Sequence, residues 1–147
     1  MKWLLPPLLW LLSLVAIVAV ATLAPMAAIL PAPFHWSGAI AVFVGAWLLV
    51  SASGQFRRVD TNINTFRDPN VPVTDGAFAF TRNPMHLGFM LTLFGAALIG
   101  NAISALAIPL LFFLVANSWY VPFEERAAAA QFGEAYAAYK ARVRRWL

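Results

Sequence analysis

Two short polar segments hold the residues of this chain that could do chemistry. One contains Glu124 and Glu125, adjacent carboxylates that follow aromatic residues and could bind a cationic ligand at the edge of an apolar segment. The two carboxylates also fit a purely structural role, without a ligand. A helix beginning at Pro122 would place both carboxylates near its N-terminus, where the macrodipole stabilises each of them by about 0.3–1 kcal/mol.

The other polar segment leads into an apolar run and contains a histidine. We expect Asn83 to be the N-cap of a helix and Pro84 its first residue, which places His86 in the first helical turn. An ionisable group inside a membrane helix is costly and tends to face a cavity, so His86 is a candidate binding residue. The alternative is a histidine that is satisfied at the membrane interface. Arg82 could be an interfacial arginine whose charged head reaches water.

Small residues line one face of the same expected helix. Gly88, Thr92 and Gly95 recur at helical spacing. Such a face permits a second helix to pack closely, or it leaves room for a ligand beside the helix. The sequence supports both interpretations.

Several kinds of active site are excluded. The chain has no cysteine, which rules out disulfides, zinc–thiolate sites and cysteine nucleophiles. It contains neither a P-loop nor a Gly-x-Gly-x-x-Gly segment. We expect His35 and His86 on opposite sides of a bilayer, so we predict no metal site. The short basic cluster stands beside a membrane, which argues against a nucleic-acid partner.

The elements that must position these residues are membrane helices. The chain of 147 residues is 62% hydrophobic and only 11% charged, whereas soluble domains are about 45–50% apolar and about 25% charged. A soluble fold of this size cannot hide so much apolar surface. We therefore expect an all-α, polytopic membrane protein with a single domain over residues 1–147.

Four apolar runs can cross about 30 Å of hydrocarbon as helices, although the third is short. We predict spans over about 8–30, 37–56, 84–100 and 102–121, a cytoplasmic loop over 57–83 and a cytoplasmic tail helix over 122–147. All ten Lys and Arg residues and all six Asp and Glu residues then fall on one side. The positive-inside rule predicts that both termini are cytoplasmic. The first run is longer than the core of a signal peptide, which favours a retained span.

The tail is predicted to be an interfacial amphipathic helix. Apolar residues recur along it at helical spacing, namely Phe132, Tyr136, Tyr139, Val143 and Trp146. Its last turns are basic and would bind anionic lipid. The basic residues are Lys140, Arg142, Arg144 and Arg145.

Two motifs, in this order, resemble the isoprenylcysteine carboxyl methyltransferase and phospholipid methyltransferase superfamily of integral membrane enzymes. The first is Arg82-Asn83-Pro84-Met85-His86-Leu87-Gly88, preceded by Asp75-Gly76-Ala77-Phe78. The second is Glu124-Glu125, followed by Phe132-Gly133-x-x-Tyr136-x-x-Tyr139 and a basic end. The resemblance covers about residues 60–147. The chain departs from the family at His86, where Tyr is usual, and it has Asn83 where many members have His.

The resemblance implies an S-adenosylmethionine-dependent methyltransferase whose cofactor pocket lies at the cytoplasmic face. Acidic residues would bind the amino group or the ribose hydroxyls, and a basic residue or a helix N-terminus would bind the carboxylate. The implied cofactor-binding residues are Gly76, Phe78, Arg82, Asn83, His86, Gly88, Glu124, Glu125 and Tyr136. The implied catalytic residues are Glu125 and Arg144, of which Arg144 would orient an anionic group of the substrate.

The expected acceptor is a lipid or another lipophilic molecule from the bilayer, either isoprenylcysteine-carboxylate-like or phospholipid-amine-like. The expected location is a bacterial-type inner membrane, with the active site facing the cytoplasm. Two alternatives stay open. An NADPH-dependent reductase of the sterol reductase type has a similar C-terminal pattern, although such enzymes are usually longer. A non-catalytic membrane scaffold or lipid-binding protein would keep the fold without the activity.

Overall fold

The computed structural model describes residues 5–58 and 73–147 of the chain. Within these ranges the protein consists of helices and turns, without a strand, which confirms the expected all-α fold. The α-helices are α1 (Pro6–Leu23), α2 (Gly38–Arg58), α3 (Pro84–Gly100), α4 (Ala107–Val115) and α5 (Val121–Arg142). Short 3-10 helices, η1 (Phe34–Ser37), η2 (Gly76–Ala79) and η3 (Ile103–Leu106), and the π-helix η4 (Ala116–Tyr120) connect them. Residues 59–72 of the predicted loop lie outside the described residues.

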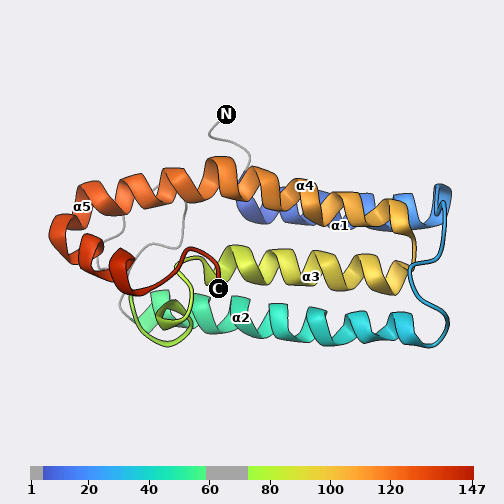
Figure 1. The fold of residues 1–147 in the computed structure, drawn as a ribbon, viewed down its shortest axis with the longest axis horizontal. Coiled ribbons are helices and arrows are strands. Elements are labelled where there is room, and N and C mark those ends of the chain that lie inside the picture. The colour runs from blue at the N-terminus through green and yellow to red at the C-terminus, as the bar shows by residue number, and fades with distance from the viewer. Residues whose placement is uncertain (1–4, 59–72) are drawn as a thin grey trace.

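Helix α3 lies in the middle of the bundle. Figure 1 shows it running between α2 and the pair formed by α1 and α4. Glycines bring α2 and α3 together: a Cβ atom on Gly45 would lie 2.7 Å from the Gly88 carbonyl oxygen, and one on Gly88 would lie 2.8 Å from the Gly45 carbonyl oxygen. Backbones that approach so closely leave no room for side chains. At Gly88, the small face of α3 is therefore a helix-packing face.

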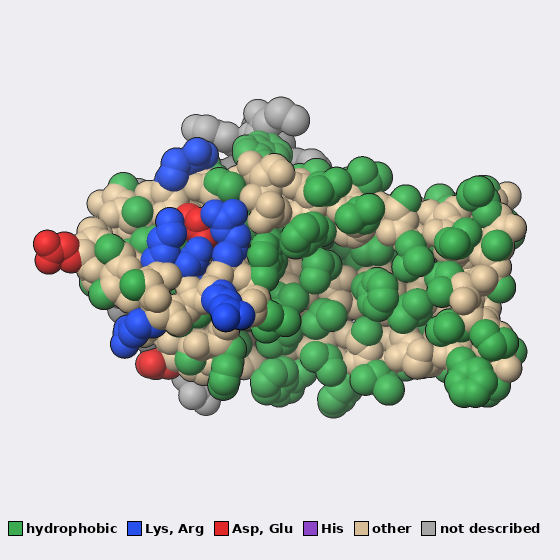
Figure 2. All heavy atoms as spheres, viewed as in Figure 1, with side chains coloured by type: hydrophobic (Ala, Val, Ile, Leu, Met, Phe, Trp, Pro, Cys, Tyr) green, Lys and Arg blue, Asp and Glu red, His purple; other side chains and the backbone are tan. Residues whose placement is uncertain are grey.

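The outer faces of the bundle are apolar. Large side chains on α1 and α2, such as Val18, Phe43 and Val50, are mostly exposed. Figure 2 shows hydrophobic side chains over most of the length of the bundle and charged side chains gathered at one end, where α5 folds back (Figure 1). Among the described residues, Pro6–Leu23, Phe34–Gln55 and Ile103–Arg142 are long and apolar enough to cross a membrane, and Pro84–Gly100 is a shorter apolar helix. This architecture is that of an integral membrane protein.

Helix α1 ends at Leu23, before the predicted limit of the first span at residue 30. Pro25 explains the difference, because a residue that precedes a proline is disfavoured in the helical conformation. Ala24 has indeed left that conformation, with φ −144° and ψ 59°. The chain from there to η1 is irregular.

Asn101 fastens this irregular stretch to the turn between α3 and α4. It follows the last residue of α3 in a left-handed conformation, with φ 49°. Its side-chain oxygen accepts hydrogen bonds from the backbone N–H groups of Ile29 and Leu30, each at 2.9 Å, and its Nδ2 donates to the Leu30 carbonyl at 2.8 Å. One asparagine thus closes the end of the bundle opposite the charged end.

The fourth apolar run and the tail form one helical rod. The backbone stays helical from α4 through η4 into α5, and Figure 1 shows α4 and α5 in line. The tail helix expected from residue 122 is instead the continuation of this rod, so Glu124 does not lie at a free helix N-terminus. Pro122 accounts for the π-turn. In a regular α-helix its ring would clash with the carbonyl four residues earlier, and the wider π-turn avoids that clash.

Helix α5 turns back on itself at Gly133. This residue has φ 49° and ψ −119°, a conformation that glycine adopts because it has no Cβ. We call residues 121–132 the first arm of α5 and residues 134–142 the second arm. Figure 1 shows the second arm folding back toward the start of α3. Gly133 therefore brings the C-terminal residues to the polar segment that precedes α3.

Candidate active site at the polar end of the bundle

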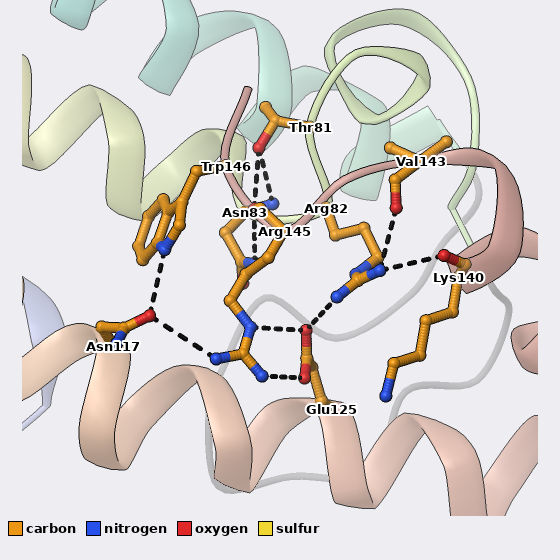
Figure 3. Close-up of polar contacts among 9 residues, drawn as sticks. All are labelled: Thr81, Arg82, Asn83, Asn117, Glu125, Lys140, Val143, Arg145 and Trp146. Atoms are coloured by element: carbon orange, nitrogen blue, oxygen red, sulfur yellow. Dashed lines mark hydrogen bonds and ion pairs between the residues drawn. The ribbon is translucent and has the colours of Figure 1, made fainter.

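A buried carboxylate holds the polar end of the bundle together. Glu125 lies on the first arm of α5, with 9% of its side chain exposed. Arg82, just before α3, donates from Nη2 to Glu125 Oε1 at 2.8 Å. Arg145, near the C-terminus, donates from Nη2 to Oε2 at 2.7 Å and from Nε to Oε1 at 3.2 Å. Figure 3 shows both guanidinium groups meeting this carboxylate, which joins three segments distant in the sequence.

The two arginines determine the charge state of Glu125, which follows the last apolar span. Burial alone raises the pKa of this carboxyl group. Hydrogen bonds from Arg145 and Arg82, together with their positive charges, outweigh burial and hold the pKa of Glu125 below its ordinary value of 4.5. The side chain is therefore a carboxylate at neutral pH. Since it is flanked by two guanidinium groups, the cluster as a whole is positively charged.

The end of the chain lies across the segment that leads into α3. We call residues 143–147 the C-terminal strap. The Arg82 backbone N–H donates to the Arg144 carbonyl at 3.0 Å. Asn83 Nδ2 and Thr81 Oγ1 donate to the Arg145 carbonyl at 3.0 Å and 3.1 Å. The strap is thus fastened by its own backbone carbonyls, and its side chains are left to act on other groups.

Arg82 also satisfies the end of α5. Its Nη1 atom donates to the carbonyl oxygens of Lys140 at 3.1 Å and Val143 at 2.8 Å. The last carbonyls of a helix have no partners within the helix, so the guanidinium takes the place of a capping group. Only 9% of the Arg82 side chain is exposed. The interpretation of Arg82 as an arginine that extends its head into water is therefore wrong.

His86 is buried beside Glu124. Its Nδ1 atom lies 3.7 Å from Glu124 Oε2, which is too long for a hydrogen bond, and its ring centre lies 6.0 Å from that of Tyr120. The His86 Nε2 atom is buried and makes no hydrogen bond with any residue in the described ranges. Buried polar atoms normally have a partner. His86 Nε2 therefore offers a hydrogen-bonding position to a ligand or a water molecule.

A hollow of ≈ 370 Å³ opens between the two arms of α5. This size lies within the range of about 300–1,000 Å³ that is typical of small-molecule sites. Its lining combines one carboxylate, two cations and one phenol with apolar surface, and consists of Pro122, Glu125, Arg126, Ala129, Gly133, Tyr136, Ala137 and Lys140. Figure 2 shows basic side chains crowded at this end of the molecule. The hollow can hold a molecule that carries charges of both signs.

The predicted N-cap is correct in position but not in its hydrogen bond. Asn83 is the N-cap of α3 and Pro84 its first residue, yet the Asn83 side chain makes no capping bond. It reaches the strap instead, as described above. The physical reason is the bond that Asn83 Nδ2 donates to the Arg145 carbonyl at 3.0 Å, which turns the side chain toward the strap so that Oδ1 does not cap the helix.

Three other predicted residues act through the backbone. Gly76 has φ 59°, and a Cβ atom there would collide with the Gln55 side chain of α2. The Phe78 carbonyl accepts a hydrogen bond from Tyr139 Oη at 2.7 Å. Gly88 faces α2, as described above. The structure thus gives all three a role in shaping the polar end, and a contact of any of them with a cofactor stays a prediction.

Arg145, which the sequence analysis did not assign to the site, lies beside Glu125. Arg144, the predicted catalytic arginine, is exposed, and its backbone carbonyl rather than its side chain is held by Arg82. The tail was expected to remain helical to residue 147, but it leaves the helix at Val143, with φ −114° and ψ 131°. Once the chain has left the helix, the Arg145 side chain reaches Glu125, while the Arg144 side chain is exposed.

The sequence interpretation also missed Asn117. Its Oδ1 accepts a hydrogen bond from Trp146 Nε1 at 3.0 Å, and Arg145 Nη1 lies 3.5 Å from the same oxygen. One signal was available, because a polar amide inside an apolar span is costly and tends to have a partner. Among the described residues, no group of three or more potential ligands is placed to hold a metal ion.

Comparisons with known proteins agree with the two motifs. The family model described as phospholipid methyltransferase matches residues 33–135, which include Arg82 and Glu125. A protein of Haemophilus influenzae described as uncharacterized is 38% identical over 64 residues, which make up 43% of this chain and 100% of that protein. No solved structure matches the chain. The chain therefore belongs to the phospholipid methyltransferase family of membrane proteins.

Proposed function

We propose that this protein is a membrane methyltransferase that uses S-adenosylmethionine and methylates a lipophilic acceptor at the cytoplasmic face. Family membership supports a membrane methyltransferase. The observation that carries the choice of cofactor is the hollow between the arms of α5, where the Glu125 carboxylate lies beside the cationic side chains of Arg126 and Lys140. The methyl donor carries an amino group, a carboxylate and a sulfonium, so it needs groups of both signs.

Glu125 has room for one more donor. A carboxylate offers about four lone-pair positions. Among the described residues, Glu125 Oε1 accepts from Arg82 Nη2 and Arg145 Nε, whereas Oε2 accepts from Arg145 Nη2 alone. Oε2 can therefore accept a further hydrogen bond from an amino group or a ribose hydroxyl. The carboxylate is already held in place, so a ligand need not order it.

The remaining lining fits the other parts of the donor. Arg126 and Lys140 suit its carboxylate, and the ring of Tyr136 suits the adenine or the sulfonium. His86 lies outside the lining of the hollow, and its buried Nε2 has no partner among the described residues, so we propose it as a further polar contact near the start of α3. When bound, S-adenosylmethionine supplies an electrophilic methyl group. This chain's residues bind and orient it.

The acceptor is proposed to arrive from the bilayer. The exposed faces of α1 and α2 are apolar, so they can contact a lipid chain while its headgroup reaches the polar end. An isoprenylcysteine-carboxylate-like and a phospholipid-amine-like acceptor both fit this route. Arg144, exposed at that end, is free of the Glu125 cluster and suits an anionic group of the acceptor. With both termini cytoplasmic, the site opens to the compartment that supplies the donor.

Calorimetric titration of the purified protein in detergent tests the proposal. We expect saturable binding of S-adenosylmethionine and S-adenosylhomocysteine, and none of NADPH. Lys140→Gln and Tyr136→Leu change the lining without removing the buried carboxylate, and each should weaken binding, the second because it removes the aromatic ring. Glu134→Gln, at an exposed position of the second arm, is the matched control and should bind normally.

Each other outcome selects an alternative. Binding of NADPH alone would identify a reductase. Absence of binding by all three ligands, in protein that unfolds cooperatively, would leave a non-catalytic scaffold. If binding of the methyl donor is found, transfer of a labelled methyl group to total membrane lipid identifies the acceptor.

A further inference from the structure

Asn117 is a polar residue that directly follows the apolar part of the rod. It lies in η4, between the apolar helix α4 and the charged first arm of α5. Polar side chains inside membrane segments are costly and are typically retained for function. Single π-turns inside α-helices likewise occur frequently at functional sites. A polar side chain and a π-turn thus coincide at Asn117. The contacts of the side chain indicate its function.

The Asn117 side chain contacts two consecutive residues of the strap. Its Oδ1 accepts from Trp146 Nε1 at 3.0 Å, and Arg145 Nη1 lies 3.5 Å away, at the limit of a hydrogen bond. The Trp146 ring also packs on Phe113 of α4, with ring centres 5.2 Å apart. Apolar packing alone would let the indole ring rotate. The hydrogen bond from Nε1 to the Asn117 amide oxygen fixes the orientation of the ring.

Arg145 extends this contact to the site. Its Nη1 atom faces Asn117, while its Nε and Nη2 atoms donate to the two oxygens of Glu125. Figure 3 shows the line from Asn117 through Arg145 to Glu125 and Arg82. The Arg145 guanidinium thus contacts Asn117 on one side, and on the other side it contacts the Glu125 carboxylate that faces the hollow.

The π-turn gives Asn117 the orientation that this contact requires. Glu125 follows Asn117 by eight positions along the rod. In a regular α-helix, at about 100° per residue, such a pair points about 80° apart. A π-turn adds one residue without adding a turn, which reduces the separation to about 20°. The side chains then lie near one face of the rod, where a single arginine can reach both.

We propose that Asn117 is a positioning residue for the cofactor site. It holds the strap through Trp146 and sets the Arg145 guanidinium, which in turn fixes the Glu125 carboxylate beside the hollow. The effect on cofactor binding rests on the proposed function. The effect on the Arg145–Glu125 pair does not, so the two can be tested separately.

The first experiment compares three variants of the full-length protein. Asn117→Leu removes the acceptor while keeping a similar size and an apolar character that suits the span. Asn117→Asp keeps an oxygen in the same place. Ser118→Leu is the matched control, since Ser118 is an exposed polar residue of the same π-turn. We expect Asn117→Leu to weaken binding of S-adenosylhomocysteine roughly tenfold, as for the loss of one charged hydrogen bond. Asn117→Asp should recover most of the affinity, and Ser118→Leu should leave it unchanged.

The second experiment asks whether Asn117 acts through Arg145. In an Arg145→Met background, Asn117→Leu should cause little further loss of affinity, because the group that it positions is gone. An equal loss in both backgrounds, or no loss in either, would overturn the proposal.

Failure of the proposed function is distinguishable from failure of this inference. If the wild-type protein binds no S-adenosylhomocysteine, the same cycle is measured by thermal unfolding. A non-additive effect of Asn117→Leu and Arg145→Met on the unfolding midpoint then supports the positioning role, and additive effects refute it. Trp146→Phe, which removes the indole N–H but keeps the ring on Phe113, should reproduce part of the Asn117→Leu effect in either assay.

Discussion

The guanidinium of Arg145 spans both oxygens of the Glu125 carboxylate, with Nη2 2.7 Å from Oε2 and Nε 3.2 Å from Oε1. Two donors in one plane fix the orientation of a carboxylate as well as its distance, which a lysine cannot do. The backbone carbonyl of Arg145 accepts hydrogen bonds from the side chains of Asn83 and Thr81. The same residue therefore fastens the C-terminal strap with its backbone and holds Glu125 with its side chain.

Replacing Arg145 should cost stability, and replacing its neighbour should not. Arg145→Ala removes two charged hydrogen bonds from a buried carboxylate that keeps its bond to Arg82. We expect a loss of about 1–2 kcal/mol in the free energy of unfolding, at the low end for charged hydrogen bonds because 35% of the Arg145 side chain is exposed. Arg144→Ala, at an exposed position, should stay within about 0.5 kcal/mol of wild type. Thermal unfolding in detergent measures both, and equal effects would contradict the assignment of Arg145 to the site.

The lowered pKa of Glu125 predicts an acid-dependent loss of stability. A carboxyl group whose pKa is depressed in the folded state stabilises the fold fully above its unfolded pKa and loses that contribution as the pH falls through its folded pKa. The stabilisation by Glu125 should therefore be complete at pH 7 and decline below its ordinary value of 4.5. The measurement is the unfolding midpoint from pH 7 to pH 3.

Glu125→Gln isolates this contribution from those of the other acids. The variant should be less stable than wild type at pH 7, and the two curves should converge as the pH falls below 4.5. Glu134→Gln, on the exposed face of the second arm, should instead run parallel to wild type. Parallel curves for wild type and Glu125→Gln would show that the ion cluster does not set the acid response.

Much of the fold was predictable because local signals and tertiary packing agree. Asn83 and Pro84 start α3 as expected, and the predicted apolar stripe of the tail survives, since its members Tyr136, Tyr139 and Trp146 are all at least partly buried. The alternation of apolar runs and charged segments predicted an all-α membrane protein. These features depend on periodicity and composition, which a single sequence displays directly.

The details of the site depend on non-local geometry. Gly133 itself is a local signal for a helix break, but good helix-forming residues follow it, so the sequence did not indicate that the chain turns back there. The direction in which the side chains of the strap point depends on where α5 ends. The prediction of a helix to residue 147 missed that end, and Arg145 was not assigned to the site. The role of Asn117 requires both the π-turn and the returning strap. Each is a consequence of the tertiary fold that residue types alone do not specify.

Gly133→Ala should destabilise the protein through backbone conformation alone. A Cβ atom at Gly133 would meet nothing within 4 Å, so there is no steric clash with other residues, but φ is +49°. Placing a non-glycine residue in such a conformation costs about 1–3 kcal/mol. Because the second arm carries the strap, binding of S-adenosylhomocysteine should weaken as well.

Gly54→Ala is the matched control for that substitution. Gly54 also has open space around its Cβ position, but it lies within the helical residues of α2 without a positive φ. Alanine there should be neutral or stabilise the protein by up to about 1 kcal/mol. Equal behaviour of the two alanine variants would mean that the turn at Gly133 is not needed for the fold.

The contact between α2 and α3 predicts a symmetric pair of effects. Gly45→Ala and Gly88→Ala each place a methyl group within 3 Å of the opposing backbone, so each should lower the free energy of unfolding by about 1–3 kcal/mol through overpacking. Thermal unfolding of the two variants tests this, again with Gly54→Ala as the control on α2.

Ligand binding then separates the two interpretations of the small face of α3. If Gly88 only packs against α2, Gly45→Ala and Gly88→Ala should change the affinity for S-adenosylhomocysteine to the same small extent, because both act through the same helix separation. If the backbone of Gly88 instead lies against the cofactor, Gly88→Ala should lose affinity while Gly45→Ala retains it. The close approach of the Gly45 and Gly88 carbonyls to each other's Cβ positions leaves no space for a ligand between the helices, so we expect the equal response.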